Sequence, residues 1–353
     1  MRRFLERFDL VDVIMWLIAA AILTLVVIGS IATLRSEKYT TEQWFDLVVS
    51  GLTQGSIYAL IALGYTMVYG VLRMINFAHS EVFMSGAFIG YFPASWMVAS
   101  GFMERNPLVG ILALFIIAAL TSIVVAILLE RIAYRPLRRA PRLVPLITAV
   151  GASLFLQYTF RGLFGSQVRS YPTFAALAGK WMLPGGFDID KISVIVIVAA
   201  AAMMLVLYLY VQRTRAGRAI RAVAEDKDVA ALMGIDVDGA IARTFVLGAF
   251  FAGLAGVLYA MVFRQVTFYM GFIPGIKAFT AAVLGGIGNI PGAMLGGLVL
   301  GVTESVGTIL FLDGLGVPAP YQLKDAIAFT VLVLILILRP TGILGERLAR
   351  AKA

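Results

Sequence analysis

The sequence predicts an all-α fold, a polytopic integral membrane helical bundle with about eight to ten transmembrane segments. Hydrophobic residues occupy 61% of the 353 positions and charged residues 14%, whereas roughly a quarter of a soluble domain is charged. A helix needs about 20 apolar residues to cross the hydrocarbon core. Eight runs of about this length or longer contain no Asp, Glu, Lys, Arg or His: 13–34, 47–72, 82–103, 107–129, 143–160, 192–212, 244–263 and 278–303. We therefore expect a single transmembrane domain over residues 1–353.

The charge and the rare residues exclude several classes of function. The net charge of +9 arises from Lys and Arg in short loops beside the apolar runs, which is typical of a membrane protein rather than a nucleic-acid-binding surface. Cysteine is absent and His79 is the single histidine, so there is no disulfide, no thiol chemistry and no cluster of His or Cys ligands. We expect no catalytic residue, no metal site and no nucleic-acid partner.

The first span is expected near residues 12–34, after Arg2, Arg3 and Arg7. This arrangement resembles a secretory signal peptide, but the apolar run exceeds the about 7–15 residues typical of one, and no clear cleavage site follows. We expect an uncleaved span that leaves the N-terminus in the cytoplasm.

Basic residues in short loops set the orientation of the following spans, because they favour the cytoplasmic side. Spans are expected near 44–71, 81–103, 107–129, 143–163, 192–211 and 244–263, which places the loops 130–142 and 212–243 and the C-terminus in the cytoplasm. The basic residues that support this assignment are Arg131, Arg135, Arg138, Arg139 and Arg142, then Arg213, Arg215, Arg218, Arg221, Lys227 and Arg243, and finally Arg339, Arg347, Arg350 and Lys352.

Residues 274–312 must begin and end on the outer side, because the last span, near 321–338, has to return the chain to the cytoplasm. The stretch Gly285–Gly292 is rich in helix breakers, and Pro291 suits the first turn of a new helix. We expect two antiparallel segments, of which 274–287 is short or re-entrant.

Two loops are expected on the outer, periplasmic side, over residues 164–191 and 312–320. The Gly and Pro content of both predicts irregular loop.

Glycine pairs inside the spans match the small-xxx-small spacing that lets helix backbones approach closely, as at Gly86–Gly90 and Gly297–Gly301. Two interpretations remain open: tight packing of a bundle, or helices that slide or break around a translocation path.

Polar residues mark the stretch 50–91. Thr53, Gln54 and Ser56 lie in an otherwise apolar span. Arg73 and Glu81 bracket a turn near the expected inner face, either as surface charges at a capped helix start or as a gate or partner contact. Between them, His79 is expected to be a hydrogen-bonded structural residue rather than a ligand or proton relay.

Ionisable residues within membrane spans are costly and usually face a cavity. Glu304 is the most suggestive such acid, although it could also lie near enough to the outer interface to be solvated. Lys277 and the Lys324–Asp325 pair are expected to be snorkelling or paired residues near outer helix ends. The candidates for a pathway or gate are Gln54, Asn76 and Glu304.

A polar island, Arg213–Asp238, separates two long apolar segments. Gly217 is expected to break the chain before a short helix over 218–224. Asp226 can cap a second helix over 227–233, which Gly234 can terminate in the left-handed conformation. The island is either an ordinary basic cytoplasmic loop or a docking surface for a partner protein, and its arrangement of Gly and Ala favours docking.

The island stretch Gly217–Ile235 resembles the cytoplasmic coupling loop of the branched-chain amino acid ABC importer permeases. The wider superfamily of these permeases includes sugar and urea permeases. The stretches Gly51–Gly90 and Leu338–Gly345 are similar to the first permease subunit of that system, except that Ser80 stands where a glycine is expected. The resemblance covers most of residues 45–346. It implies a type II ABC importer-like permease whose coupling residues are Gly217, Arg218, Ala222, Glu225, Asp226, Ala230, Gly234 and Ile235.

No Gly-x-x-x-x-Gly-Lys-Ser/Thr loop occurs in the sequence, so the chain has no ATPase site of this type. The resemblance implies a second homologous permease forming a heterodimer, two cytoplasmic ATP-binding subunits that use the ATP, and a periplasmic substrate-binding protein, all at the bacterial inner membrane. The chain itself would bind no cofactor. The substrate would be a branched-chain amino acid, with urea or an amide as alternatives. An ion-coupled secondary transporter and a channel are alternatives from other classes.

Overall fold

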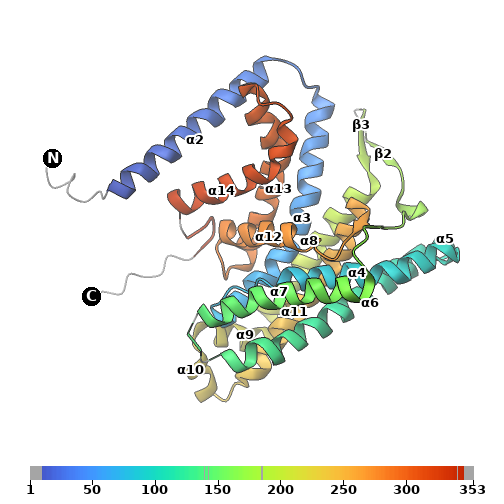
Figure 1. Cartoon of the computed structure of the whole chain (residues 1–353), viewed down its shortest axis with the longest axis vertical. Helices are drawn as coiled ribbons and strands as arrows, with labels where there is room; N and C mark the ends of the chain where they lie inside the picture. Colours follow the sequence, from blue (N-terminus) through green and yellow to red (C-terminus); the bar gives the residue numbers. More distant parts are fainter. Residues whose placement is uncertain (1–9, 139, 142, 184–185, 340, 346–353) are drawn as a thin grey trace.

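The computed structural model describes residues 10–138, 140–141, 143–183, 186–339 and 341–345. Within these ranges, nine helices are long and apolar enough to cross a membrane, and a shorter apolar helix accompanies them. The expected helical bundle is confirmed (Figure 1). The arginines at the N-terminus and those after Gly345 lie outside the described residues, as do Arg139 and Arg142.

The helices follow the expected spans closely. Figure 1 shows them in chain order as α2 (Leu10–Arg35), α3 (Thr41–Leu72), α4 (His79–Ala99), α5 (Phe102–Arg105), α6 (Pro107–Leu128), α7 (Leu143–Phe164), α8 (Lys191–Arg213), α9 (Arg215–Glu225), α10 (Lys227–Leu232), α11 (Val237–Phe263), α12 (Phe272–Gly285), α13 (Ile290–Leu312) and α14 (Lys324–Leu338).

Two helices extend into stretches that were expected to be loop. The fourth span continues past α6 as a π-helical turn, η1 (Leu129–Tyr134), and a 3-10 turn, η2 (Arg135–Leu137). The helix α11 begins at Val237, because the Asp236 side chain caps it by accepting a hydrogen bond from the Gly239 amide. The segment between α8 and α11 is therefore shorter than the expected loop 212–243.

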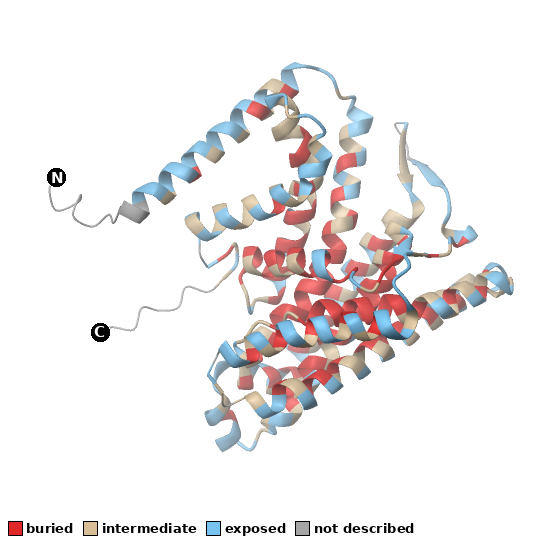
Figure 2. Cartoon of the chain, in the orientation of Figure 1, coloured by how far each residue is buried: buried red, intermediate tan, exposed pale blue. Residues whose placement is uncertain are grey.

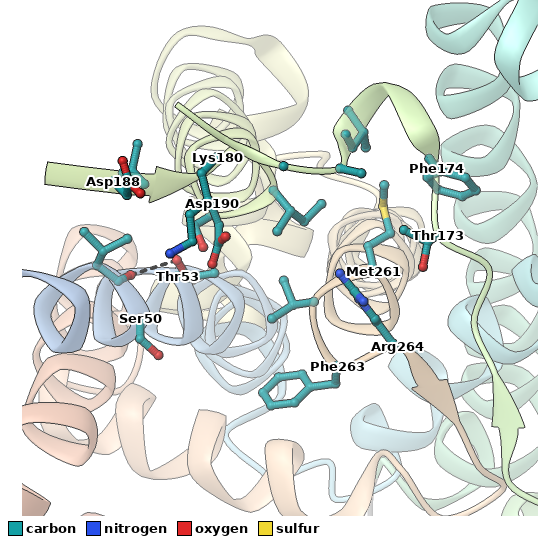
Figure 3. Close-up of a pocket in the computed structure, with 18 of the residues that line it drawn as sticks. Ser50, Thr53, Thr173, Phe174, Lys180, Asp188, Asp190, Met261, Phe263 and Arg264 are labelled. Atoms are coloured by element: carbon teal, nitrogen blue, oxygen red, sulfur yellow. Dashed lines mark hydrogen bonds between the residues drawn. The ribbon is translucent and has the colours of Figure 1, made fainter. Parts of the chain in front are cut away.

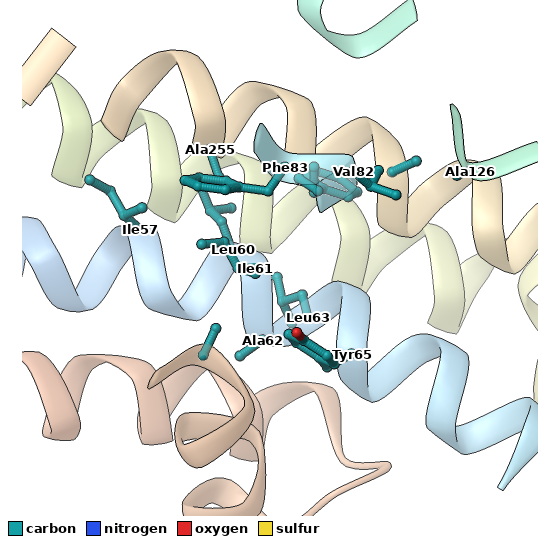
Figure 4. Close-up of a cluster of buried hydrophobic side chains, with 14 of the residues drawn as sticks. Ile57, Leu60, Ile61, Ala62, Leu63, Tyr65, Val82, Phe83, Ala126 and Ala255 are labelled. Carbon is teal, nitrogen blue, oxygen red and sulfur yellow. The ribbon is translucent and has the colours of Figure 1, made fainter. Parts of the chain in front are cut away.

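The core lies around α3, α4 and α11, where buried residues concentrate in Figure 2. Their stretches 55–72, 82–99 and 244–263 contain no charged residue, as expected for helix segments surrounded by other helices. Figure 4 shows Ile57, Leu60 and Ile61 of α3 beside Phe83 of α4 and Ala255 of α11. By contrast, α2 exposes most of its apolar side chains, and in α14 only Ala328 is buried, so the outer faces of both helices suit lipid or another subunit.

Close backbone contact between α3 and α13 explains the glycine pairs. A Cβ added at Gly297 would lie 2.5 Å from the Ala59 backbone, and one at Gly55 would lie 2.8 Å from the Gly297 carbonyl oxygen. A Cβ at Gly86 would lie 2.8 Å from the Gly253 Cα, whereas at Gly90 the nearest atom is 3.5 Å away. The packing interpretation is therefore confirmed for Gly86 and Gly297, whereas the space at Gly90 would accept a Cβ atom.

The break expected in Gly285–Gly292 is present. The helix α12 ends at Gly285, and α13 begins at Ile290 with Asn289 as its cap. With 14 residues, α12 is about 21 Å long, too short to cross the hydrocarbon core. The chain after α14 packs on this turn, since the Ile343 amide donates to the Leu284 carbonyl over 2.8 Å. The short antiparallel segment is therefore confirmed.

The expectation of an irregular loop over 164–191 is wrong in part. The strands β2 (Lys180–Leu183) and β3 (Phe187–Asp190) form an antiparallel hairpin, and β1 (Arg169–Ser170) pairs with β4 (Gln265–Val266). The ring centroids of Phe187 and Phe45 of α3 lie 4.9 Å apart. This contact joins residues far apart in the sequence, so local glycine and proline content did not predict it.

Candidate functional site

The polar island folds as two short helices, α9 and α10, and the chain turns a corner at Thr214 between α8 and α9 (Figure 1). The Thr214 hydroxyl caps α9 by accepting a hydrogen bond from the Gly217 amide over 2.9 Å. Gly217 thus lies inside the first turn of α9, and the expectation that it breaks the helix is wrong. A Cβ at this position would lie 2.5 Å from the Tyr210 carbonyl oxygen. Small size, not backbone flexibility, is what the corner requires.

The second helix forms as expected. The Asp226 carboxylate accepts hydrogen bonds from the Asp228 and Val229 amides at 2.9 and 3.0 Å, which caps α10. Gly234 has a φ of +80°, and the Ile235 amide donates to the Ala230 carbonyl over 3.0 Å. This left-handed glycine closes the helix end.

One face of this helix pair packs on the bundle. Ile220, Val223 and Ala230 are buried, and Arg73, the residue that ends α3, donates from its guanidinium to the Ala224 carbonyl over 2.9 Å. The helix pair is thus attached directly to the central helix α3. Among the expected coupling residues, Gly217 and Ala230 are buried, Ala222 and Ile235 are half-buried, and Arg218, Glu225, Asp226 and Gly234 are exposed.

The other face exposes three apolar side chains, Val229, Leu232 and Met233, which are 54%, 87% and 77% exposed. We call these three residues the apolar tip. They lie outside the long apolar helices, on a segment that is otherwise rich in charge. A cluster of exposed apolar side chains in a polar segment marks an interaction surface.

An ion-pair network beside the helix pair was not predicted from the sequence. Arg138 pairs with both Glu130 and Asp238, and Arg135 pairs with Asp238 over 2.8 Å. The network joins the end of the α6 segment to the start of α11. Nearby, burial lowers the pKa of the Lys227 ammonium, and the positive charge of Arg138 lowers it further.

Within the bundle, Lys277 and Glu304 are both 2% exposed, and their side chains pair over 2.5 Å. The Lys277 ammonium also pairs with Asp325 over 2.6 Å and lies 3.5 Å from the Tyr58 hydroxyl. Snorkelling is therefore wrong for Lys277, and pairing is correct. The antiparallel return of α12 and α13 places these charges together, which a linear sequence does not show.

Glu81 is fully buried, so the interpretation as a surface charge is wrong for it. Its carboxylate accepts hydrogen bonds from Gln157 and Ser153 of α7 at 2.8 and 3.1 Å. Asn76 is buried too, and its side-chain oxygen accepts from the Tyr134 hydroxyl over 2.5 Å. Its place is in the packing between the α3–α4 turn and η1.

His79 is buried against Gly64 and in edge contact with Tyr65, with ring centroids 5.0 Å apart. Its position agrees with a structural role. Its Nε2 atom has no hydrogen-bond partner within the described part of the chain, so the expected hydrogen bond at that atom is not observed.

Two cavities lie at the end of the bundle that carries the β2–β3 hairpin. The larger, which we call the outer cavity, has a volume of about 560 Å³ and is enclosed by α3, α8, α11 and the hairpin (Figure 3). The smaller has a volume of about 380 Å³ and is lined by Glu304. Both are lined by Asp46, Ser50 and Gln54, which share one face of α3. The structure thus brings Gln54 and Glu304 together, while Asn76 lines neither cavity.

A bundle of membrane helices with polar cavities, buried charges and an exposed pair of amphipathic helices has the organisation of a membrane transport protein. The sequence from residue 47 to residue 336 matches the family described as "Branched-chain amino acid transport system / permease component". Because the match covers most of the chain, this protein belongs to that family. It is a permease without an ATPase site of its own, and partner subunits of this class of transporter hydrolyse the ATP.

Several relatives are similar over nearly their whole length. The high-affinity branched-chain amino acid transport system permease protein BraD of Pseudomonas aeruginosa is 45% identical over 86% of this chain and 96% of its own. LivH of Escherichia coli K12 is 40% identical over 87% and 96%. A solved structure, PsaBC from Streptococcus pneumoniae in complex with Fab, aligns with a TM-score of 0.45 and 15% identity over 88% of this chain and 96% of that one.

Proposed function

We propose that this chain is one of two homologous permease subunits in a bacterial inner-membrane importer for branched-chain amino acids. The relatives named above are high-affinity branched-chain amino acid permease proteins, which supports this substrate class. In this proposal two ATP-binding subunits act from the cytoplasm, and a periplasmic binding protein delivers the substrate. Both chain ends are cytoplasmic, as the positions of the basic residues favour.

The apolar tip is the observation that carries the coupling role. Val229, Leu232 and Met233 are exposed on a segment with no membrane-length helix, so the bundle leaves them uncovered. A groove on an ATPase subunit is the surface that suits such side chains. We infer that α9 and α10, over residues 215–232, form the coupling segment.

The coupling segment contacts the bundle directly, so its movement would be transmitted to the membrane helices. Gly217 lets α9 pack against the end of α8, and Arg73 links the end of α9 to α3. Ile220 and Val223 pack in the core beside these helices. A rigid-body shift caused by ATPase closure would therefore move α3 and α8, which line the outer cavity.

Substitution of the apolar tip tests this assignment. Replacing Leu232 and Met233 by Asp should weaken retention of the ATPase subunits by about tenfold or more, because buried apolar anchors of an interface contribute about 2 kcal/mol or more. The measurement is co-purification of the ATPase subunits with the permease from membranes. Arg131→Ala, an exposed change at the end of the α6 segment, is the matched control.

Normal retention and normal uptake in the doubly substituted variant would contradict the coupling role. The substrate class has a separate measurement, uptake of labelled leucine in a strain that lacks this gene and carries it on a plasmid. Competition by isoleucine and valine but not by urea is expected. Competition by urea alone would favour the urea or amide permease.

A further inference from the structure

The outer cavity, which is open to solvent, combines charges of both signs at one end of the bundle. Five ionisable side chains line it: Asp46, Lys180, Asp188, Asp190 and Arg264. Within the described ranges, none of the five forms an ion pair or a side-chain hydrogen bond. The cavity therefore holds acids and bases whose bonding capacity is left for water or a ligand.

The ionisable side chains lie on two sides of the cavity. Figure 3 shows Asp188, Asp190 and Lys180 beside α3, while Arg264 lies across from them near Met261 and Phe174. A small molecule with a positive and a negative group at its head could contact both sides. A simple cation would leave Arg264 without a partner, and a simple anion would leave the carboxylates of Asp188 and Asp190 without one.

An apolar wall accompanies these charges. Phe174, Leu177, Ile189, Ile192 and Met261 line the same cavity. Its volume of about 560 Å³ falls within the roughly 300–1,000 Å³ of small-molecule sites. The wall suits an aliphatic side chain, because burial of apolar surface is favourable at roughly 25 cal/mol per Å².

The walls are held by contacts outside the cavity. The tilted ring contact between Phe187 and Phe45 holds the β2–β3 hairpin against α3. Arg264 ends α11 in the left-handed conformation, with φ at +55°, and its carbonyl oxygen accepts a hydrogen bond from the Tyr171 amide over 2.9 Å. Hydrogen bonds therefore hold the backbone of Arg264 in place, and its guanidinium extends from this fixed backbone.

We propose that the outer cavity is a binding site in the permease itself for a free α-amino acid with an apolar side chain. Arg264 binds the α-carboxylate, for which its planar fork of donors is suited. Asp46 and Asp190 accept the α-ammonium, and Met261 and Leu177 contact the side chain. The inference rests on the proposed function as an amino-acid permease, and it adds a site that holds the substrate before it passes the bundle.

The test measures ligand binding to the full transporter in lipid nanodiscs without the binding protein. Competition against labelled leucine compares leucine with leucinamide, which lacks the carboxylate, and with 4-methylpentanoate, which lacks the ammonium. Arg264→Gln should weaken the binding of leucine by about 10- to 100-fold, because one charged hydrogen-bonded contact contributes about 1.5–3 kcal/mol. The affinity for leucinamide should stay unchanged. Asp46→Asn with Asp190→Asn should weaken leucine and leave 4-methylpentanoate unchanged.

Arg161→Gln, which changes an exposed arginine outside the cavity, is the control and should bind all three ligands normally. Equal weakening of leucine and leucinamide by Arg264→Gln would show a merely structural role and overturn the inference. So would a wild-type transporter that imports leucine with its binding protein but binds none without it. A transporter that imports no branched-chain amino acid at all would instead overturn the proposed function, and this inference with it.

Discussion

The cap of α10 provides the sharpest test of the coupling segment. Asp226 accepts two backbone hydrogen bonds at 2.9 and 3.0 Å, and Asp226→Ala removes both. Loss of such a cap costs about 1 kcal/mol. The helix has only six residues, far below the about 12–15 that an isolated helix needs, so it has little stability to lose.

A cost of about 1 kcal/mol lowers the folding equilibrium constant of α10 by about fivefold, since about 1.4 kcal/mol corresponds to a factor of ten. Docking of an ATPase subunit then has to refold α10, so its affinity for the permease should fall by up to about fivefold. The core of the bundle does not include Asp226, which is exposed, and the thermal stability of the bundle should stay unchanged.

The assay titrates purified ATPase subunit against permease in nanodiscs and follows leucine uptake in cells. Asp226→Ser should restore both signals, because serine is also a favoured cap. Asp228→Ala removes a neighbouring charge whose side chain forms no hydrogen bond among the described residues, so it serves as the matched control. If Asp226→Ser fails as badly as Asp226→Ala, or if Asp226→Ala docks normally, the capping argument is refuted.

Two further predictions concern the bundle. Gly301→Val should destabilise the protein by about 1–3 kcal/mol, because any side chain there meets the Gly55 backbone of α3, whereas Gly90→Ala should be tolerated; thermal unfolding in detergent compares them. Lys277→Met should lower the free energy of unfolding by about 3–5 kcal/mol, because it leaves Glu304 buried without its cation. Adding Glu304→Leu should recover most of this loss. A double variant no more stable than Lys277→Met alone would contradict the buried-pair account.

Local chemistry made parts of the coupling segment predictable. Asp226 and Gly234 are recognised by residue type and spacing alone, since a cap and a left-handed helix end depend on atoms within a few residues. Gly217 was misinterpreted for the converse reason. The groups that require a small residue there belong to the end of α8, and they reach it only when the corner folds.

The sequence by itself determined the class of the protein and the order of its apolar segments, and it placed their number at about eight to ten, because the length and polarity of a segment decide whether it can cross a bilayer. It also identified Glu304 and Gln54 as unusual. Only the tertiary structure decided that Lys277 neutralises Glu304, that Glu81 is buried against α7, and that the hairpin closes a cavity containing Arg264. Each of these depends on side chains from helices far apart in the chain, and the energy of a charge is set by its neighbours in space rather than in sequence.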